Sequence, residues 1–312
     1  MKINKVTDIA IKPSAEGIIA SMEAQLKNPK TKQKWDSPFK RKLGIGKNAL
    51  TGNYYKGSNL MLTMFDTDVN KYAYAIYATE KQWKTLNCKV VKGSPSLPIT
   101  FWKNITEDSK RIKGKKVVVS SFCLYSRVYN VKFIEGDYKL PTFKTGKQYS
   151  IKTIDDFVKA TKVELKHTEN NGCFYSPKKD YINMEYKTNF KDTEESNATV
   201  HYYSTLFHEL THSTGHESRT NRIKTNLNKF GSHTTEYAFE ELVAEIGSIL
   251  LGHQFNIEKT VRDNHSKYLN SWIKALKDDY TLIATAFAQA QKAVDYFVED
   301  KWGYLVGFVI NE

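Results

Sequence analysis

The segment "LFHELTHSTGHESRTNR" (206–222) contains three of the chain's eight histidines within nine positions. His208 and His212 fit the spacing H-E-x-x-H, and the apolar residues around them recur with the period of a helix. Because positions i and i+4 share one face of a helix, both imidazoles can bind the same zinc ion. Glu209 then lies beside the metal, where it can accept a proton from water instead of acting as a ligand. The segment therefore predicts a metal site for peptide hydrolysis, on a helix that we expect Gly215 to end in a left-handed conformation.

A catalytic zinc site also needs a third protein ligand and an open position for water. The metzincin spacing would place this ligand at Ser218, so we reject that arrangement. A glutamate from a later helix is the alternative, and "TEYAFEELVAEIGSILLG" (235–252) has Glu241 and Glu245 on one face. By this spacing Glu241 can bind the metal and Glu245 can orient a ligating histidine, although both could be solvated surface charges. Weaker candidates for the third ligand are Glu240, about 100° round the helix from Glu241, and His233.

The charge of the chain is divided unequally between its two halves. Residues 1–136 contain 25 Lys+Arg and 10 Asp+Glu, a net charge of +15, whereas residues 137–312 contain 22 and 24, a net charge of −2. Solubility alone could account for a basic surface, but it does not require one half to hold all of the excess. Concentrated positive charge is typical of a domain that binds a nucleic-acid backbone.

The length of 312 residues suits two domains, and their predicted elements give an α+β fold class. We expect a basic α+β domain at 1–136, a linker at 137–150 and a mostly helical domain with a small sheet at 151–312. In the first domain the predicted elements are helices at 14–27 and from 58, and strands at 73–79, 97–102 and 116–134. In the second they are helices at 151–161, 198–214, 235–253, 262–278 and 280–299, and strands at 162–167 and 180–185.

No membrane-spanning or disulfide-bonded segment is expected from the sequence. The longest apolar runs, such as 246–251, are too short to cross a bilayer, and the first residues lack the apolar stretch of a secretory signal. The cysteines are odd in number and widely spaced: Cys88, Cys123 and Cys173. We therefore expect reduced thiols and a protein of the host cytoplasm.

Aromatic residues and lysines alternate in the basic half, as in proteins that stack bases and hold phosphates of single strands. Most of these aromatics are expected in the core, and the loop 47–59 is the best candidate surface. Gly46, Gly52 and Gly57 would let its backbone approach a phosphate. Lysine outnumbers arginine 22 to 3 before residue 137, which favours backbone contacts over base-specific ones. The candidate DNA contacts are Lys47, Asn48, Tyr54, Tyr55, Lys56, Asn59, Trp83 and Lys84.

Residues 174–184, "FYSPKKDYINM", alternate between polar and apolar types in their second part. This pattern predicts a strand. It could be an edge strand next to the metal, where a peptide substrate pairs by strand addition, or an ordinary core strand.

Several segments, taken in order, resemble ArdC-type antirestriction proteins. The resemblance in the second half lies in 174–184, "TLFHELTHSTGHESRTNR" (205–222), "FEELVAEIGS" (239–248) and "AQAQKAVDYF" (288–297). These are similar to the zincin-like metallopeptidase domain that also occurs in polyvalent proteins of phages and plasmids. In the first half "NALTGNYYKGSN" (48–59), with the segments at 83–86 and 101–103, is similar to the companion N-terminal domain.

The resemblance implies a gluzincin-like peptidase with His208, His212 and Glu241 as ligands and Glu209 as the catalytic base. It also implies an N-terminal domain that binds single-stranded DNA, in a protein that protects incoming DNA. The metal expected is Zn²⁺, with another divalent ion such as Mn²⁺ as an alternative, and the protein substrate is unknown. A second hypothesis is a non-catalytic DNA-coating protein whose metal domain is structural or vestigial. The intact Glu209 favours the enzyme, and a nuclease or primase accessory is disfavoured because no Asp-rich two-metal cluster is present.

Overall fold

The computed structural model describes residues 8–27, 45–108, 116–140, 151–169, 171–193, 196–223, 235–255, 257 and 266–301. The backbone divides into two compact units, Met1–Ala20 with Leu43–Lys139, and Ser21–Lys42 with Leu140–Glu312. The expected two-domain α+β fold class is confirmed. Within the described ranges, no helix is long and apolar enough to cross a membrane.

The N-terminal unit is built around a small sheet. Up to residue 140 the elements are α2 (Lys12–Lys27), β1 (Lys47–Asn48), α3 (Ser58–Val69), β2 (Ile76–Ala78), α4 (Glu80–Thr85), β3 (Lys89–Val90), β4 (Leu97–Asp108), β5 (Lys116–Asn130), the 3-10 turn η2 (Val131–Phe133) and β6 (Ile134–Glu135). The four-stranded sheet has the order β1-β2-β5-β4, with β1 and β2 parallel and the other neighbours antiparallel. β3 and β6 form a separate antiparallel pair.

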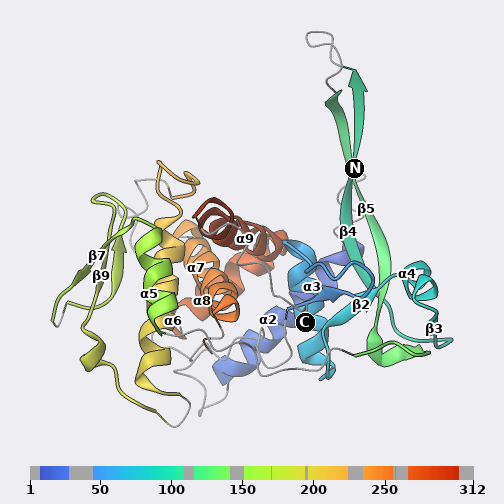
Figure 1. The fold of residues 1–312 in the computed structure, drawn as a ribbon, viewed down its shortest axis with the longest axis horizontal. Helices are drawn as coiled ribbons and strands as arrows, with labels where there is room; N and C mark the ends of the chain where they lie inside the picture. The colour runs from blue at the N-terminus through green and yellow to red at the C-terminus, as the bar shows by residue number, and fades with distance from the viewer. Residues whose placement is uncertain are drawn as a thin grey trace. The chain divides into compact units, whose positions relative to one another are not determined.

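The strands β4 and β5 form a long two-stranded arm (Figure 1). Their pairing runs from Leu97 opposite Val128 to Asp108 opposite Lys116, so the strand predicted at 97–102 continues to Asp108. Large apolar side chains are exposed along the arm, unlike those of a core strand: Phe101, Ile105, Val117, Val119, Leu124 and Tyr125.

The helix α3 is buried on most of its circumference, because residues 60–65 and Thr67 are all buried. Gly46 lies directly against it, since a Cβ at Gly46 would overlap the side chain of Thr63. This glycine therefore permits close packing inside the protein, and the expectation that Gly46 admits a phosphate is wrong. Gly52 and Gly57 do adopt positive φ, 73° and 56°, which a glycine accepts without strain.

In its described residues from 151 onward, the C-terminal unit combines four long helices with one short helix and a small sheet. Its elements are α5 (Ile151–Ala160), β7 (Glu164–His167), β8 (Phe174–Ser176), β9 (Tyr181–Met184), the 3-10 turn η3 (Lys187–Asn189), α6 (Ala198–Ser213), α7 (Thr235–Gln254), α8 (Ser266–Asp278) and α9 (Thr281–Lys301). The sheet order is β7-β9-β8, with β9 parallel to β7 and antiparallel to β8. The strand predicted from "DYINM" is thus the central one, and β8 lies at an edge.

Helix α6 begins where its sequence provides a cap. The side chain of Asn197 accepts a hydrogen bond from the backbone N–H of Val200 at 3.0 Å, which satisfies one of the free donors of the first turn. From Tyr202 onward nearly all residues of α6 are buried, and Phe207 of this helix stacks on Phe255 with 5.6 Å between the ring centroids. The helix with the H-E-x-x-H motif is therefore an internal element of the unit.

Helices α6 and α7 approach closely at Gly247. A Cβ at this position would overlap the side chain of Thr211 and lie 2.6 Å from its Oγ1. Thr211 cannot turn away freely, because its Oγ1 already bonds the carbonyl of Phe207 at 2.8 Å. Only glycine fits at this crossing without a shift of one helix.

The end of α6 differs from the expectation for Gly215. The residue that ends the helix is Thr214, with φ −62° and ψ −22°, and Gly215 has no positive φ. A Cβ at Gly215 would instead lie 2.5 Å from Cγ1 of Ile223. The glycine is thus needed because a side chain at this position would overlap Ile223. The prediction that Gly215 has a left-handed conformation is wrong.

We predict that Gly247→Ala destabilises the protein by about 1–3 kcal/mol, because the added methyl overpacks the α6–α7 contact. Thermal unfolding measures the loss. Thr211→Ala in the same chain removes the overlapping atoms and should restore part of the melting temperature. A Gly247→Ala protein as stable as wild type would contradict the close packing described.

Candidate metal centre

Helix α6 places the three polar residues of the motif inside the protein. His208, Glu209 and His212 are 4%, 6% and 9% exposed, and all three belong to the buried part of the helix. The imidazole Nε2 atoms of His208 and His212 face each other at 3.1 Å. Two buried imidazoles at this separation need a shared proton or a shared cation.

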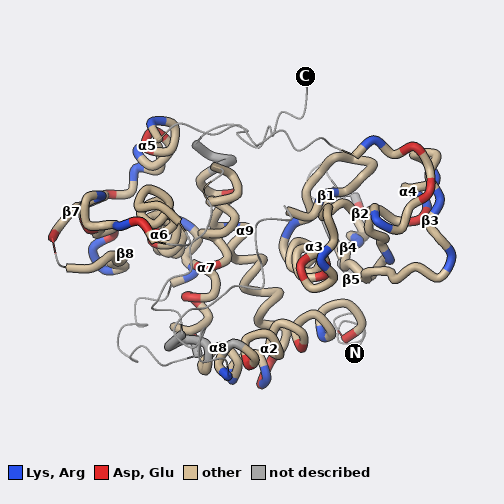
Figure 2. The backbone as a smooth tube through the Cα atoms, turned by 90° about the horizontal axis from the view of Figure 1, so that it is seen from below, with Lys and Arg blue, Asp and Glu red and all other residues tan. Residues whose placement is uncertain are grey.

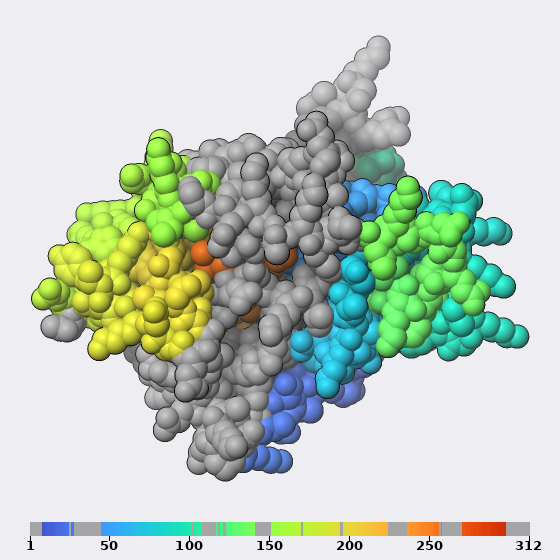
Figure 3. Space-filling model, turned by 60° about the horizontal axis from the view of Figure 1, so that its bottom comes forward, coloured from blue at the N-terminus to red at the C-terminus, as the bar shows by residue number. Residues whose placement is uncertain are grey.

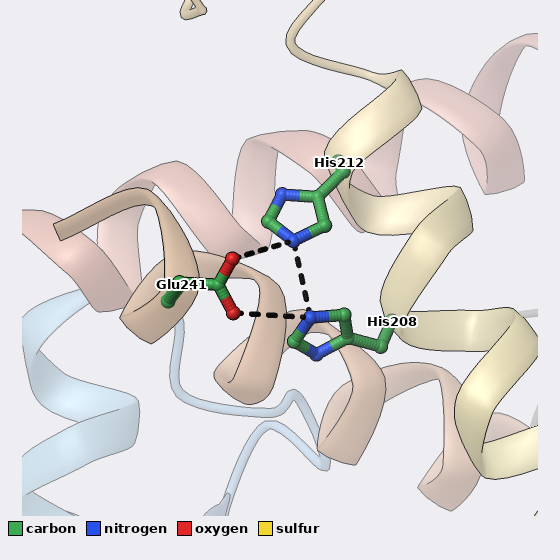
Figure 4. A group of neighbouring side chains, drawn as sticks. All are labelled: His208, His212 and Glu241. Carbon is green, nitrogen blue, oxygen red and sulfur yellow. Dashed lines mark hydrogen bonds and ion pairs between the residues drawn. The ribbon is translucent and has the colours of Figure 1, made fainter. Parts of the chain in front are cut away.

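Helix α7 brings Glu241 to the same point, as Figure 4 shows. Its two carboxylate oxygens lie 3.5 Å from Nε2 of His208 and 3.6 Å from Nε2 of His212. Among the described residues, His208, His212 and Glu241 form the one group of His, Cys, Asp and Glu side chains that could hold a metal ion.

The separations fit a divalent ion. Tetrahedral Zn²⁺ with N and O ligands at about 2.0–2.1 Å keeps neighbouring ligand atoms about 3.3 Å apart. In this cluster the two imidazole nitrogens are 3.1 Å apart, slightly closer than that value. The carboxylate oxygens lie 3.5 and 3.6 Å from these nitrogens, slightly farther than that value. A small cation can therefore be accommodated between the side chains with only slight adjustment.

Each histidine has a further carboxylate at its other ring nitrogen. Nδ1 of His208 lies 2.9 Å from Oε1 of Glu245, and Nδ1 of His212 lies 3.0 Å from Oε1 of Glu240. With Nδ1 protonated toward these oxygens, both Nε2 atoms present a lone pair to the common point. The structure places Glu245 beside His208, where the sequence predicted an orienting role.

Glu240, a weaker candidate for the third ligand by sequence, does not belong to the cluster. Its carboxylate lies outside the ligand cluster and pairs with Arg222, whose Nε and Nη2 are 2.7 and 2.8 Å from Oε2 and Oε1. Burial raises the pKa of Glu240, but Arg222 and His212 outweigh burial and lower it below its usual range. The sequence gives little indication of this ion pair. Arg222 follows His212 by ten residues, and the loop between them has no periodic pattern from which its path could be predicted.

The electrostatics of the cluster favour positive charge. Burial lowers the pKa of His212, yet its hydrogen bond to Glu240 and the nearby carboxylates together raise that pKa to about 9. Glu209 is one of these carboxylates. Burial also raises the pKa of Glu241, but its bond to His208 and the imidazole charges lower it well below its usual value.

The third histidine of the segment 206–222 does not join the cluster. His216 stands in the loop after α6, where its Nδ1 lies 2.8 Å from Oγ of Ser218 and 3.8 Å from Asp180. Asp180, in the turn before β9, is bound by Arg219, which also donates to the carbonyl of Ser213 at 2.6 Å. In Figure 3 this loop (yellow) lies against the residues of the small sheet (yellow-green). His233 lies outside the described residues.

The predicted DNA contacts lie in the N-terminal unit, mostly on a turn after β1. Asn48 Oδ1 accepts hydrogen bonds from the backbone N–H groups of Leu50 and Thr51, and its Nδ2 donates to Gln82 of α4. The turn is thereby joined to α4. The aromatic and basic residues of this region are partly or fully accessible: Lys47, Tyr54 and Tyr55 are half-buried, and Lys56 and Lys84 are exposed.

Three of these residues have structural roles that compete with DNA contact. Trp83 is fully buried and its Nε1 donates to the carbonyl of Tyr129 at 3.1 Å, so no base can stack on it. The prediction that Trp83 contacts DNA is therefore wrong. Asn59 binds both the N–H and the carbonyl of Thr100, and Tyr55 donates to the carbonyl of Tyr77.

Comparisons with known proteins give both units a family. Residues 152–289 match the family of zincin-like metallopeptidases MPTase-PolyVal, and residues 11–131 match the N-terminal domain of the anti-restriction factor ArdC. The chain thus has the two domains of an ArdC-type antirestriction protein.

The chain is similar throughout to the crystal structures of the antirestriction protein ArdC from the R388 plasmid. The metal-free structure has 29% sequence identity and a TM-score of 0.70, covering 92% of this chain and 95% of that one. The Mn(II)-bound structure has 29% identity and a TM-score of 0.73, covering 94% and 98%.

Curated relatives include longer proteins. The chain is 30% identical over 282 residues to the DNA primase TraC of Escherichia coli, which covers 84% of this chain and 25% of TraC. It is 26% identical over 256 residues to the uncharacterized protein y4eC of Sinorhizobium fredii, covering 80% of this chain and 79% of that protein. The chain thus spans about a quarter of this TraC relative.

We predict that the purified protein binds one divalent ion per chain and that His208→Ala/His212→Ala abolishes this binding, because two of three ligand atoms are lost. Elemental analysis after dialysis measures the stoichiometry. His216→Ala is the matched control and should retain the ion, since His216 lies outside the cluster. Full occupancy in the double variant would exclude this centre.

Proposed function

We propose that the protein is a divalent-metal-dependent peptidase joined to a domain that binds single-stranded DNA, and that it protects incoming DNA. The observation that supports the peptidase best is the buried set of His208, His212 and Glu241, together with Glu209, which follows His208 on the same helix, is also buried and does not belong to the set. A purely structural ion needs no additional buried carboxylate. The match to a zincin-like metallopeptidase family supports the same chemistry.

In this proposal the chain holds the ion through the Nε2 atoms of both histidines and a carboxylate oxygen of Glu241. Such an ion supplies Lewis-acid chemistry, because it lowers the pKa of water and polarises a peptide carbonyl. Glu209 accepts the proton that the attacking water loses and donates it to the leaving amine. Glu245 and Glu240 keep the two imidazoles in one tautomer and orientation throughout.

We propose Zn²⁺ as the metal, because two imidazoles and one carboxylate with an open position make a common catalytic zinc site. Mn²⁺ is the alternative. Imidazole and carboxylate ligands also accept this ion, and a Mn(II)-bound structure is among those similar to this chain.

The proposal of DNA binding rests on charge. All of the excess positive charge lies before residue 137, and Figure 2 marks Lys and Arg residues around α4, β2 and β3. One curated relative is named a DNA primase, and the similar antirestriction protein comes from a plasmid, which supports a nucleic-acid partner. We propose that the N-terminal unit binds single strands through their phosphates and brings the peptidase to a protein substrate there.

We place the DNA on the turn after β1 and on α4. Lys47 Nζ lies 6.0 Å from the centre of the Tyr54 ring, which combines a charge with an aromatic face. The Asn48–Gln82 bond holds this turn against α4, where Lys84 is exposed. Lys47, Tyr54, Lys56 and Lys84 are the proposed contacts, whereas Asn48, Tyr55 and Asn59 hold the scaffold.

We predict that Glu209→Ala keeps both metal and melting temperature but reduces peptide hydrolysis at least about 100-fold, because the proton acceptor is lost. A quenched fluorescent peptide library, with and without single-stranded DNA, measures hydrolysis. Glu217→Ala, at an exposed acid of the neighbouring loop, is the control and should match wild type. Undiminished hydrolysis by Glu209→Ala would refute the assigned role. An inactive wild type would refute the peptidase itself.

We predict that Tyr54→Leu in the full chain weakens binding to a thymine oligonucleotide by about 1–3 kcal/mol, since a stacking face is removed. Fluorescence anisotropy measures binding, and wild-type affinity should fall steeply with salt. Tyr55→Leu is the matched variant. It should lower the melting temperature more than the affinity, because the Tyr55 hydroxyl bonds the carbonyl of Tyr77 at 3.2 Å. A Tyr54→Leu protein that loses stability but not affinity would place Tyr54 in the core.

A further inference from the structure

Arg222 is buried at the end of the loop that follows α6. Its side chain is 6% exposed, and the loop turns back so that Ile223 N–H bonds the carbonyl of Gly215 at 2.8 Å. Thr220 Oγ1 also bonds the carbonyl of Thr214 at 2.6 Å. The loop therefore returns Arg222 to the C-terminal end of the helix that contains both histidines.

The guanidinium uses all three of its nitrogens there. Nε and Nη2 bind the two oxygens of Glu240, as a planar fork matches a carboxylate. Nη2 also donates to the carbonyl of Thr211 at 2.9 Å, and Nη1 donates to Oγ1 of Thr214 at 3.0 Å. Arg222 thus links the end of α6 to the first turns of α7.

The oxygen that Arg222 binds through Nη2 is the one that faces His212. Oε1 of Glu240 lies 2.8 Å from Arg222 Nη2 and 3.0 Å from His212 Nδ1. The arginine therefore fixes the position of an acceptor that in turn fixes the imidazole. It also balances one negative charge in a region where Glu240, Glu241 and Glu245 are all buried.

We infer that Arg222 is a positioning residue of the metal centre, acting through Glu240 on His212. The inference rests on the proposed function, because it assumes that Nε2 of His212 binds the ion. Arg222 holds the carboxylate of Glu240 in place, Oε1 of Glu240 accepts a hydrogen bond from Nδ1 of His212, and Nε2 is left as the ligand atom. A lysine would preserve the charge but could not bind both oxygens and both threonine acceptors at once.

The test uses the full chain and three variants: Arg222→Lys, Arg222→Gln and Glu240→Gln. Affinity for Zn²⁺ is measured by chelator competition, the visible spectrum of bound Co²⁺ reports ligand geometry, and melting with and without metal reports folding. Outer carboxylate and arginine partners of a ligand typically change metal affinity 10–100-fold. We expect a loss of about this size for both Arg222 variants and an altered Co²⁺ spectrum.

Arg219→Gln is the matched control. Arg219 is 11% exposed, forms an ion pair with Asp180 and donates to the carbonyl of Ser213, but it touches no carboxylate that contacts His208 or His212. Its loss should lower the melting temperature without changing metal affinity. The effect of Arg222→Gln should also largely disappear in a Glu240→Gln background, because the two residues act on the same imidazole.

Three results would overturn the inference. The first is wild-type metal affinity in both Arg222 variants. The second is an equal loss of affinity in Arg219→Gln, which would indicate general destabilisation. The third is full additivity of the Arg222 and Glu240 substitutions. If Arg222→Gln does not fold, the metal affinity of Arg222→Lys alone tests the inference. A wild-type protein without metal affinity would instead refute the proposed function from which the inference starts.

Discussion

Because Gly247 has no side chain, α7 lies against Thr211 of α6 at a distance that no other residue would permit without a shift. The whole metal centre depends on this contact. His208 and His212 come from one helix and Glu241 from the other, and their nearest atoms are 3.1 to 3.6 Å apart. A displacement of either helix by an ångström would change the two separations between Glu241 and the histidines, 3.5 and 3.6 Å, by a large fraction. The packing of two apolar helices thus sets the geometry of a polar site.

The same contact forces carboxylates into the interior. Glu209, Glu240, Glu241 and Glu245 are all buried, and Glu245 is fully inaccessible. Burying charge without compensation is costly, and removing one partner of a buried pair costs more than the pair contributes. Arg222 balances Glu240, and the imidazole of His208 lies 2.9 Å from the carboxylate of Glu245 and 3.5 Å from that of Glu241. The protein therefore maintains a preformed anionic site at some expense in stability, which a bound cation would offset.

The long helices and the grouping of His208, His212 and Glu241 could be predicted from the sequence, because both depend on short-range geometry. Apolar period and helical spacing depend on neighbouring residues, so the predicted 198–214 and 235–253 agree closely with α6 and α7. The roles of Glu240 and Arg222 could not be predicted, because they depend on how a loop without periodicity folds back. Trp83 was wrongly assigned to DNA for a different reason. Aromatic residues and lysines alternate in a surface loop and in an amphipathic helix alike, so the pattern does not distinguish the two. The strands β1, β3 and β6 have two residues each and form only where tertiary pairing supports them.

The arm of β4 and β5 has a consequence for the behaviour of the protein in solution. In the described sheet β4 is terminal, so its outer backbone groups lie along a free edge, beside exposed Phe101 and Ile105. Long apolar edges of this kind invite pairing with another chain. Lys103 and Glu107, both exposed on β4, place charges along that edge, and a register irregularity after Ile105 interrupts its regular pleat. Colloidal stability at high concentration therefore depends on a few surface charges on one ribbon more than on the packing of either core.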